Sequence, residues 1–148
     1  MLKIIVDTSV WSEALRRKGQ SLESKNIFLN EIIQNEDKII LTGIILQEIL
    51  TGIKNDILFS NIKNILKDFA YIEAKKKDYI DAADLKNKLS KKGVTAGSVD
   101  FLIACICINN NFLLASYDND FRHISKNSEL QVIDFEEYKK IKAGQSLT

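Results

Sequence analysis

Short aliphatic runs alternate with longer segments of helical periodicity along this chain, and that alternation restricts its fold more than any other feature. Apolar runs that fit buried strands occupy residues 2–6, 38–41, 71–72, 112–115 and 130–133. Helical patterns of apolar residues fill segments 27–33, 43–53, 57–69, 75–91 and 98–109. Strands separated by helices pair in parallel and are covered by helices, so the sequence predicts an α/β sandwich.

The element ends carry few but useful signals. The chain has no proline and six glycines, so helices and strands should dominate. We expect Thr42 and Ser98 to cap the helices that follow them, and Lys92-Gly93 to end the charged helix before it. Segments 12–24 and 116–125 are expected to be polar connections. Without a repeat or linker, residues 1–148 are predicted to form one domain.

Charge and hydropathy exclude little about function but argue against a membrane protein. The 21 basic and 20 acidic residues give a net charge of +1, which neither requires nor excludes nucleic acid. Segment 4–6 is too short for the apolar core of a signal peptide. The longest apolar run, 101–108, is far below the ~20 residues that span a bilayer. We therefore expect a cytoplasmic protein without membrane contact.

The cysteines and the histidine predict neither a metal-binding site nor a catalytic triad. Cys105 and Cys107 lie two positions apart in a predicted helix, so they point about 160° apart and read as core residues. The single histidine, His123, is interpreted as a surface residue. The chain therefore has too few histidine and cysteine ligands for a zinc site, and one histidine also argues against a Ser-His-Asp triad. There is also no Gly-x-Ser-x-Gly elbow and no Gly-rich phosphate loop.

Acidic residues follow two of the predicted strands directly. Asp7 ends the strand in IIVDTSVW (4–11), and Asp118 and Asp120 follow the strand in LLASYDNDF (113–121). Ligands of parallel sheets bind beyond the carboxyl ends of the strands. Alternatively, Asp7 is a turn former or helix cap, and Asp120 caps a short helix that starts near Phe121.

Two further carboxylates lie in apolar helices. Glu48 of TGIILQEILTGI (42–53) falls at the margin of the apolar face, where we expect it to be half-buried and to need a partner. A snorkelling side chain or one ion pair would also explain it. Asp100 of GSVDFLIACICI (97–108) lies in the first turn of the most apolar helix. The helix dipole favours it there by ~0.3–1 kcal/mol, but its apolar neighbours predict that its oxygens face a pocket.

Carboxylates gathered at one sheet edge would repel each other. At ~4 Å, an effective dielectric constant of 20 gives about 4 kcal/mol per pair. A hard cation removes that cost, and oxygen ligands favour Mg²⁺ or Mn²⁺ over zinc. The spacing of Asp118 and Asp120 does not fit a calcium loop, because the central Gly and closing Glu are missing.

In this order and spacing, the chain resembles PIN-domain ribonucleases, specifically the VapC toxins of toxin–antitoxin pairs. The resemblance rests on IIVDTSVW, LTGIILQEIL, SVDFLIACICI and LLASYDNDF and covers residues 4 to about 135. It implies a three-layer sandwich with a central, mostly parallel sheet of four or five strands and helices on both faces. It also implies a Mg²⁺- or Mn²⁺-dependent endoribonuclease that leaves a 5′-phosphate and a 3′-hydroxyl. It further implies that the protein forms a homodimer and a hetero-oligomer with a cognate antitoxin.

The resemblance also implies roles for particular residues. The catalytic acids would be Asp7, Glu48, Asp100 and Asp118. Of these, Asp7 and Asp100 are the expected metal ligands, with Glu48 and Asp118 as candidate further ligands. The supporting residues would be Thr8, Ser9, Ser116 and Asp120. Whether Asp118 or Asp120 is the fourth acid stays open at this point.

The hydrolase prediction has two competitors. A non-catalytic PIN-like domain would bind RNA or protein, but such domains lose acids from the cluster, and every expected acid is present here. A phosphatase of the haloacid-dehalogenase type would need a second Asp two residues after Asp7, where this chain has Ser9. Basic clusters at 16–18, 75–77 and 91–92 could contact RNA phosphates, although each also fits a solvated helix face.

Overall fold

The computed structural model describes residues 1–15 and 27–144, and it contains a five-stranded sheet in which every neighbouring pair is parallel. The strand order is β3-β2-β1-β4-β5. The strands are β1 (Lys3–Val6), β2 (Lys38–Thr42), β3 (Ala70–Ile72), β4 (Leu113–Ala115) and β5 (Val132–Ile133). The predicted α/β fold with a parallel sheet is therefore confirmed.

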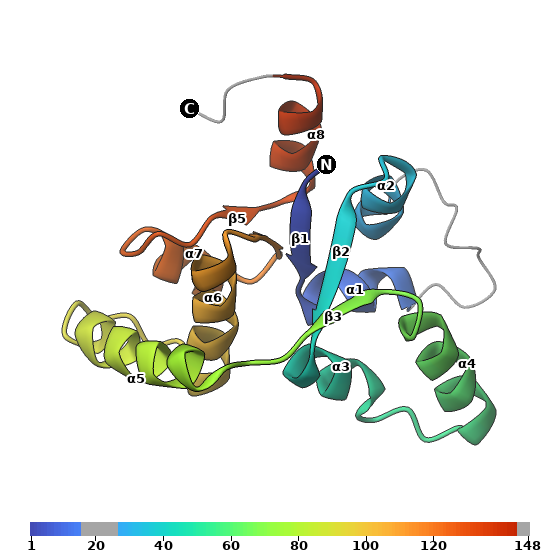
Figure 1. The fold of residues 1–148 in the computed structure, drawn as a ribbon, viewed down its shortest axis with the longest axis horizontal. Helices are drawn as coiled ribbons and strands as arrows, with labels where there is room; N and C mark the ends of the chain where they lie inside the picture. The colour runs from blue at the N-terminus through green and yellow to red at the C-terminus, as the bar shows by residue number, and fades with distance from the viewer. Residues whose placement is uncertain (16–26, 145–148) are drawn as a thin grey trace.

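Helices connect the strands and flank the sheet (Figure 1). The described helices are α1 (Thr8–Leu15), α2 (Phe28–Gln34), α3 (Gly43–Leu50), α4 (Asp56–Leu66), α5 (Lys76–Ser90), α6 (Ser98–Asn110), α7 (Asn119–Ser125) and α8 (Phe135–Lys142). The strand order changes direction at β1: β2 and β3 extend the sheet on one side of it, and β4 and β5 on the other. Such a switch point is where open parallel sheets place their ligands.

The central elements are continuous apolar runs in the sequence because they are buried on all sides in the core. Ile4, Ile5 and Val6 of β1 are fully buried, as expected for a strand covered on both faces. In α6 the residues from Ile103 to Cys107 are all buried. Cys105 and Cys107 are free thiols in this core, in agreement with their interpretation as packing residues. This packing fixes the two elements from which Asp7 and Asp100 project.

Helices occupy the described part, 12–15, of one segment predicted as a polar connection and most of the other, 116–125, for which a short helix near Phe121 was the alternative; residues 16–24 lie outside the described residues. α1 starts at Thr8, directly after Asp7, and buries Val10, Trp11 and Ala14. The Trp11 ring packs edge-on against Phe69 at 5.2 Å between centroids. α7 occupies 119–125 and buries two apolar residues one turn apart. Both helices are short, so few apolar positions mark them in the sequence.

The predicted helix caps are half right. Thr42 caps α3, with its hydroxyl oxygen accepting from the Ile45 amide at 3.5 Å. The cap assigned to Ser98 was wrong: Gly97 is the N-cap of α6, and Ser98 is its first helical residue. The carboxylate of Asp100 accepts from the Gly97 amide at 3.2 Å. An acid at the third helical position thus satisfies an amide that the helix leaves unpaired.

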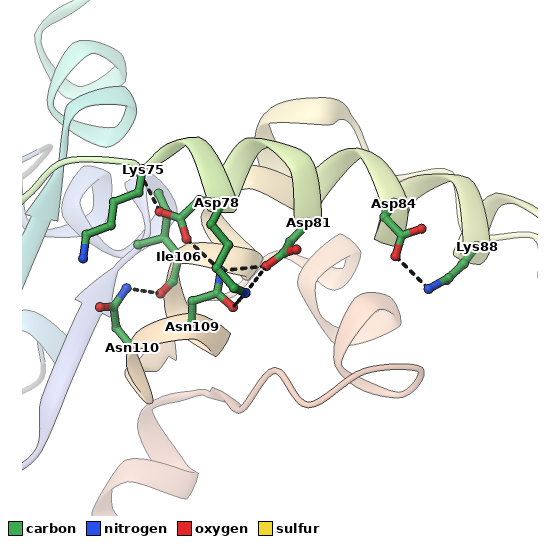
Figure 2. Close-up of polar contacts among 9 residues, drawn as sticks. Lys75, Asp78, Asp81, Asp84, Lys88, Ile106, Asn109 and Asn110 are labelled. Atoms are coloured by element: carbon green, nitrogen blue, oxygen red, sulfur yellow. Dashed lines mark hydrogen bonds and ion pairs between the residues drawn. The ribbon is translucent and has the colours of Figure 1, made fainter.

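Polar contacts help to hold the charged helix α5 against α6, as Figure 2 shows. Asp78 is 3% exposed, and its two oxygens accept from the Lys75 amide at 2.7 Å and the Asn109 side chain at 2.8 Å. The Asn109 amide group also donates to Asp81 at 3.1 Å. Because a buried carboxylate must be hydrogen-bonded, Asn109 has a structural role.

No helix within residues 1–15 and 27–144 is both long and apolar enough to cross a bilayer.

Candidate functional site

Asp7 lies at the switch point of the sheet, at the carboxyl end of β1. Its amide donates to the Ala115 carbonyl at 2.9 Å, which continues the β1–β4 pairing one residue past the strand. Its carbonyl accepts from the amides of Val10 and Trp11, so the same residue starts α1. Asp7 is 7% exposed. Strand β4 and helix α1 therefore fix the backbone of Asp7 from both sides. The alternative that Asp7 starts a helix is thus correct, and it is compatible with a role of its side chain in the site.

The side chain of Asp7 is held by two serines. Its Oδ2 accepts from the hydroxyl of Ser9 at 2.8 Å and from the hydroxyl of Ser116 at 2.9 Å. The Ser9 amide approaches the same oxygen at 3.4 Å. Ser116 follows β4 and is 2% exposed. Both serines had been predicted as supporting residues, and both contact Asp7 in the structure.

Asp118 and Asp120 sit at the start of α7, beyond the carboxyl end of β4. Asp118 is the N-cap of this helix, with its Oδ1 accepting from the Asp120 amide at 2.9 Å. The prediction that Asp120 provides the cap was wrong, because α7 begins at Asn119 and not near Phe121. Asp120 instead lies in the first turn, partly buried, while Asp118 is exposed.

Asp100 shows that the acids gather at one place. Burial raises the pKa of its carboxyl, and the charges of Asp118, Asp120 and Asp7 raise that pKa further. The hydrogen bond from the Gly97 amide opposes this effect but does not cancel it. Asp7, which follows β1, and Asp118 and Asp120 at the start of α7 are thus close enough to act on the carboxyl of Asp100 in α6. Asp100 is partly buried, whereas the prediction that its oxygens face a pocket stays a prediction.

Glu48 stands at the rim of this group. The predicted half-burial was wrong: Glu48 is exposed on α3, because the wheel position at the margin of the apolar face turns outward. Its Oε2 accepts from the Thr8 hydroxyl at 3.2 Å. Thr8 directly follows Asp7, so this bond links α3 to the start of α1.

The donor chemistry of the group fits a hard divalent cation. Its side chains offer carboxylate oxygens, and the pKa of Asp100 is raised by burial and further by the charges of the other aspartates, a repulsion that a cation would relieve. Within the described parts of the chain, no three His, Cys, Asp or Glu side chains have the geometry to hold a metal ion as they stand. The acids are thus linked by the effect of their charges on Asp100 and not by a preformed ligand geometry.

A cavity of about 490 Å³ is lined by residues of α3, β3, α5 and α6, and none of the four aspartates or Glu48 lines it. Its lining includes Ile44 and Gln47 of α3 and Leu102 of α6, which are close in sequence to Glu48 and Asp100. Tyr71 and Tyr79 line the same cavity and are more than half exposed. Nothing in the sequence pattern had singled out either tyrosine, because an aromatic residue beside a strand or on a helix usually belongs to the core.

The remaining predicted positions divide into three groups. His123 is exposed, as expected. The basic cluster at 16–18 lies outside the described residues. Of the other basic residues, Lys77 contacts Asp81 at 2.5 Å and Asn109 at 3.2 Å, so it serves the α5–α6 contact, whereas Lys91 and Lys92 are exposed.

Comparisons with known proteins agree with this arrangement. A model of the PIN domain family matches residues 4–127. No curated protein sequence matches the chain significantly.

Several solved structures share the fold. VapBC2 from Rickettsia felis, bound to a promoter DNA fragment, aligns with 20% identity and a TM-score of 0.72, covering 90% of this chain and 98% of that chain. VapBC-1 from nontypeable Haemophilus influenzae gives 17% identity and a TM-score of 0.72, covering 91% and 99%. FitAcB from Neisseria gonorrhoeae gives 16% identity and a TM-score of 0.67, covering 90% and 98%. At these identities the likeness establishes the fold.

Proposed function

The chain belongs to the PIN domain family, and from that premise we propose that it is a Mg²⁺- or Mn²⁺-dependent endoribonuclease of the VapC type. The observation that supports this most is the position of Asp7 at the switch point of the sheet, close enough to Asp100 that the charges of Asp118, Asp120 and Asp7 add to the effect of burial and raise the pKa of Asp100. Acids that repel each other in an apo protein are costly unless they serve a ligand that carries positive charge.

The proposal assigns each acid a task. Asp7 and Asp100 hold the cation, since both project from rigid elements and are at least partly buried. Asp118 and Glu48, which are exposed, complete the site from the rim. A bound Mg²⁺ or Mn²⁺ would supply an activated water and neutralise charge on the phosphoryl oxygens. Exposed lysines such as Lys91 and Lys92 contact backbone phosphates, which positions RNA without reading its sequence.

Cleavage of RNA by the isolated protein tests the activity. Purified protein, free of any partner, is incubated with structured RNAs in Mg²⁺ or Mn²⁺, with EDTA and Asp7→Asn as controls. We expect cleavage that both controls abolish. If the wild-type protein cuts nothing while a related toxin cuts under the same conditions, the nuclease proposal fails. Release of phosphate from small phosphoesters without RNA cleavage would point to a phosphatase instead.

We propose further that the chain forms a homodimer and binds a cognate antitoxin. The neighbours named as VapBC complexes support a protein partner of this kind. An antitoxin that presents a guanidinium to the cluster would replace the charge of the cation and bind a carboxylate bidentately. Light scattering of the free protein and of the co-purified complex tests both assemblies. A complex that still cuts RNA at the rate of the free protein would contradict binding over the cluster.

A further inference from the structure

Two serine hydroxyls at the switch point form a connected pattern that fixes the direction of each hydrogen bond. Ser9 Oγ accepts from the Tyr117 amide at 3.2 Å, and Ser116 Oγ accepts from the Asp118 amide at 3.0 Å. An amide can only donate, so each hydroxyl uses a lone pair there. Its one proton is then free to point to Asp7 Oδ2, which lies 2.8 Å from Ser9 Oγ and 2.9 Å from Ser116 Oγ.

The two oxygens of Asp7 are therefore not equivalent. Oδ2 accepts hydrogen bonds from both serine hydroxyls, and the Ser9 amide lies near the same oxygen. These contacts use both lone pairs of Oδ2. Oδ1 receives no hydrogen bond from the described residues. Asp7 is also 7% exposed, so water gives Oδ2 little alternative to its two serine partners.

We infer that Ser9 and Ser116 are positioning residues that reserve Asp7 Oδ1 for the cation and tie the loop carrying Asp118 to the start of α1. This inference rests on the proposed function and deepens it, because it makes Asp7 a ligand through one oxygen only. Ser116 contributes more than Ser9: it is 2% exposed, and its amide partner belongs to a candidate site residue, Asp118. Water can replace the hydroxyl of the partly exposed Ser9 more easily.

Amide hydrogen exchange in the metal-free protein tests the hydrogen-bond pattern. Ser116→Ala should speed exchange of the Asp118 amide by about fivefold and leave the Tyr117 amide unchanged, and Ser9→Ala should do the reverse. Ser125→Ala is the matched control, because the Ser125 hydroxyl lies in α7 and donates to the Arg122 carbonyl at 2.8 Å. Unchanged exchange of both amides in both variants would overturn the inference.

Mn²⁺ calorimetry tests the consequence for the site. Ser116→Ala should weaken binding by roughly tenfold to a hundredfold, the range for partners that orient metal ligands. Ser116→Thr keeps the hydroxyl and should recover most of the affinity, and Ser125→Ala should bind as the wild type does. A folded Ser116→Ala protein with wild-type affinity would overturn the positioning role.

The outcomes separate the two proposals. If the wild-type protein neither binds Mn²⁺ nor cuts RNA, the proposed function fails, while the exchange data still decide the hydrogen-bond pattern. If the wild type binds and cuts and Ser116→Ala does the same, only the positioning inference fails. If Ser116→Ala does not fold, the same two measurements on Ser9→Ala and Ser9→Thr decide: unchanged exchange of the Tyr117 amide together with equal Mn²⁺ affinity in both variants contradicts the inference.

Discussion

Ionised Asp100 costs the folded chain stability, because its carboxyl is partly buried and faces the charges of Asp118, Asp120 and Asp7. Its pKa in the folded state is raised above the unfolded value near ~3.9. A raised carboxyl pKa means that the folded state binds protons more readily than the unfolded state. The cost is therefore absent below the unfolded pKa, grows as the pH rises through the folded pKa, and is fully present at neutral pH.

Asp100→Asn should therefore raise the melting temperature of the apo protein by a few degrees at pH 7 and abolish RNA cleavage. Asparagine can still accept from the Gly97 amide, so the start of α6 is kept. The gain should shrink as the pH falls through the raised pKa of the wild-type carboxyl, and it should be absent below about 4. Thermal melts from pH 3 to pH 8 measure it. A variant that is less stable than the wild type at pH 7, or that cuts RNA normally, would contradict the role of Asp100.

Single substitutions also decide whether Asp118 or Asp120 is the fourth acid of the site. Because Asp118 caps α7, Asp118→Ala should lose ~0.5–2 kcal/mol of stability whatever its role in the site. Asparagine caps about as well as aspartate, so Asp118→Asn removes the charge and keeps the cap. We predict that Asp118→Asn reduces cleavage without changing the melting temperature, and that Asp120→Asn reduces it less. The reverse ranking of the two cleavage rates would make Asp120 the fourth acid.

At the scale of elements, the last helix is joined to the sheet far from the acids. Asp37 precedes β2, at the amino edge of the sheet, and its side chain is 1% exposed. It accepts from the Tyr138 hydroxyl at 2.6 Å and the Leu2 amide at 2.9 Å, and it pairs with Lys142 at 3.0 Å. Burial alone would raise the pKa of Asp37, but these partners outweigh burial and lower it. Helix α8 accordingly lies beside the N-terminus (Figure 1).

Tyr138→Phe should lower the free energy of unfolding by about 1.5–3 kcal/mol at pH 7, as for a hydrogen bond to a charged group. A lowered carboxyl pKa stabilises the fold above the unfolded pKa near ~3.9, and that stability is lost as the pH falls through the folded pKa. The difference between variant and wild type should therefore narrow below pH 4. Urea unfolding at several pH values measures it, and RNA cleavage at pH 7 should be unchanged. A difference that stays constant down to pH 2 would contradict the role of Asp37.

At the scale of the whole molecule, strand order explains why acids distant in sequence meet. Asp7 and Asp118 are 111 positions apart, yet β1 and β4 are neighbours in the sheet. The parallel α/β fold could be predicted, because aliphatic runs alternated with helical patterns. The position of Asp7 and Asp118 at the carboxyl edge could be predicted from the strands that they follow.

Other features could not be predicted, for identifiable reasons. Helix α7 appeared only as an alternative to a polar connection, because two buried residues, Phe121 and Ile124, give too short a periodic signal. That alternative placed the start of the helix near Phe121 and therefore gave the cap to Asp120 instead of Asp118. Glu48 was expected to be half-buried because a helical wheel fixes its direction but not which neighbouring elements cover that side. The two serines of the Asp7 contact were identified as hydroxyl residues, but their shared acceptor oxygen depends on tertiary geometry.

Mn²⁺-induced broadening of amide resonances tests the central claim most directly, because a paramagnetic ion weakens the signals of residues near its binding site. We predict that low Mn²⁺ concentrations first broaden the amides around Asp7, Asp100 and Asp118, and that Asp7→Asn prevents it. Helix α5, which carries Asp78, Asp81 and Asp84, is the internal comparison. Broadening that begins on α5, or that persists unchanged at the switch point in Asp7→Asn, would contradict the account.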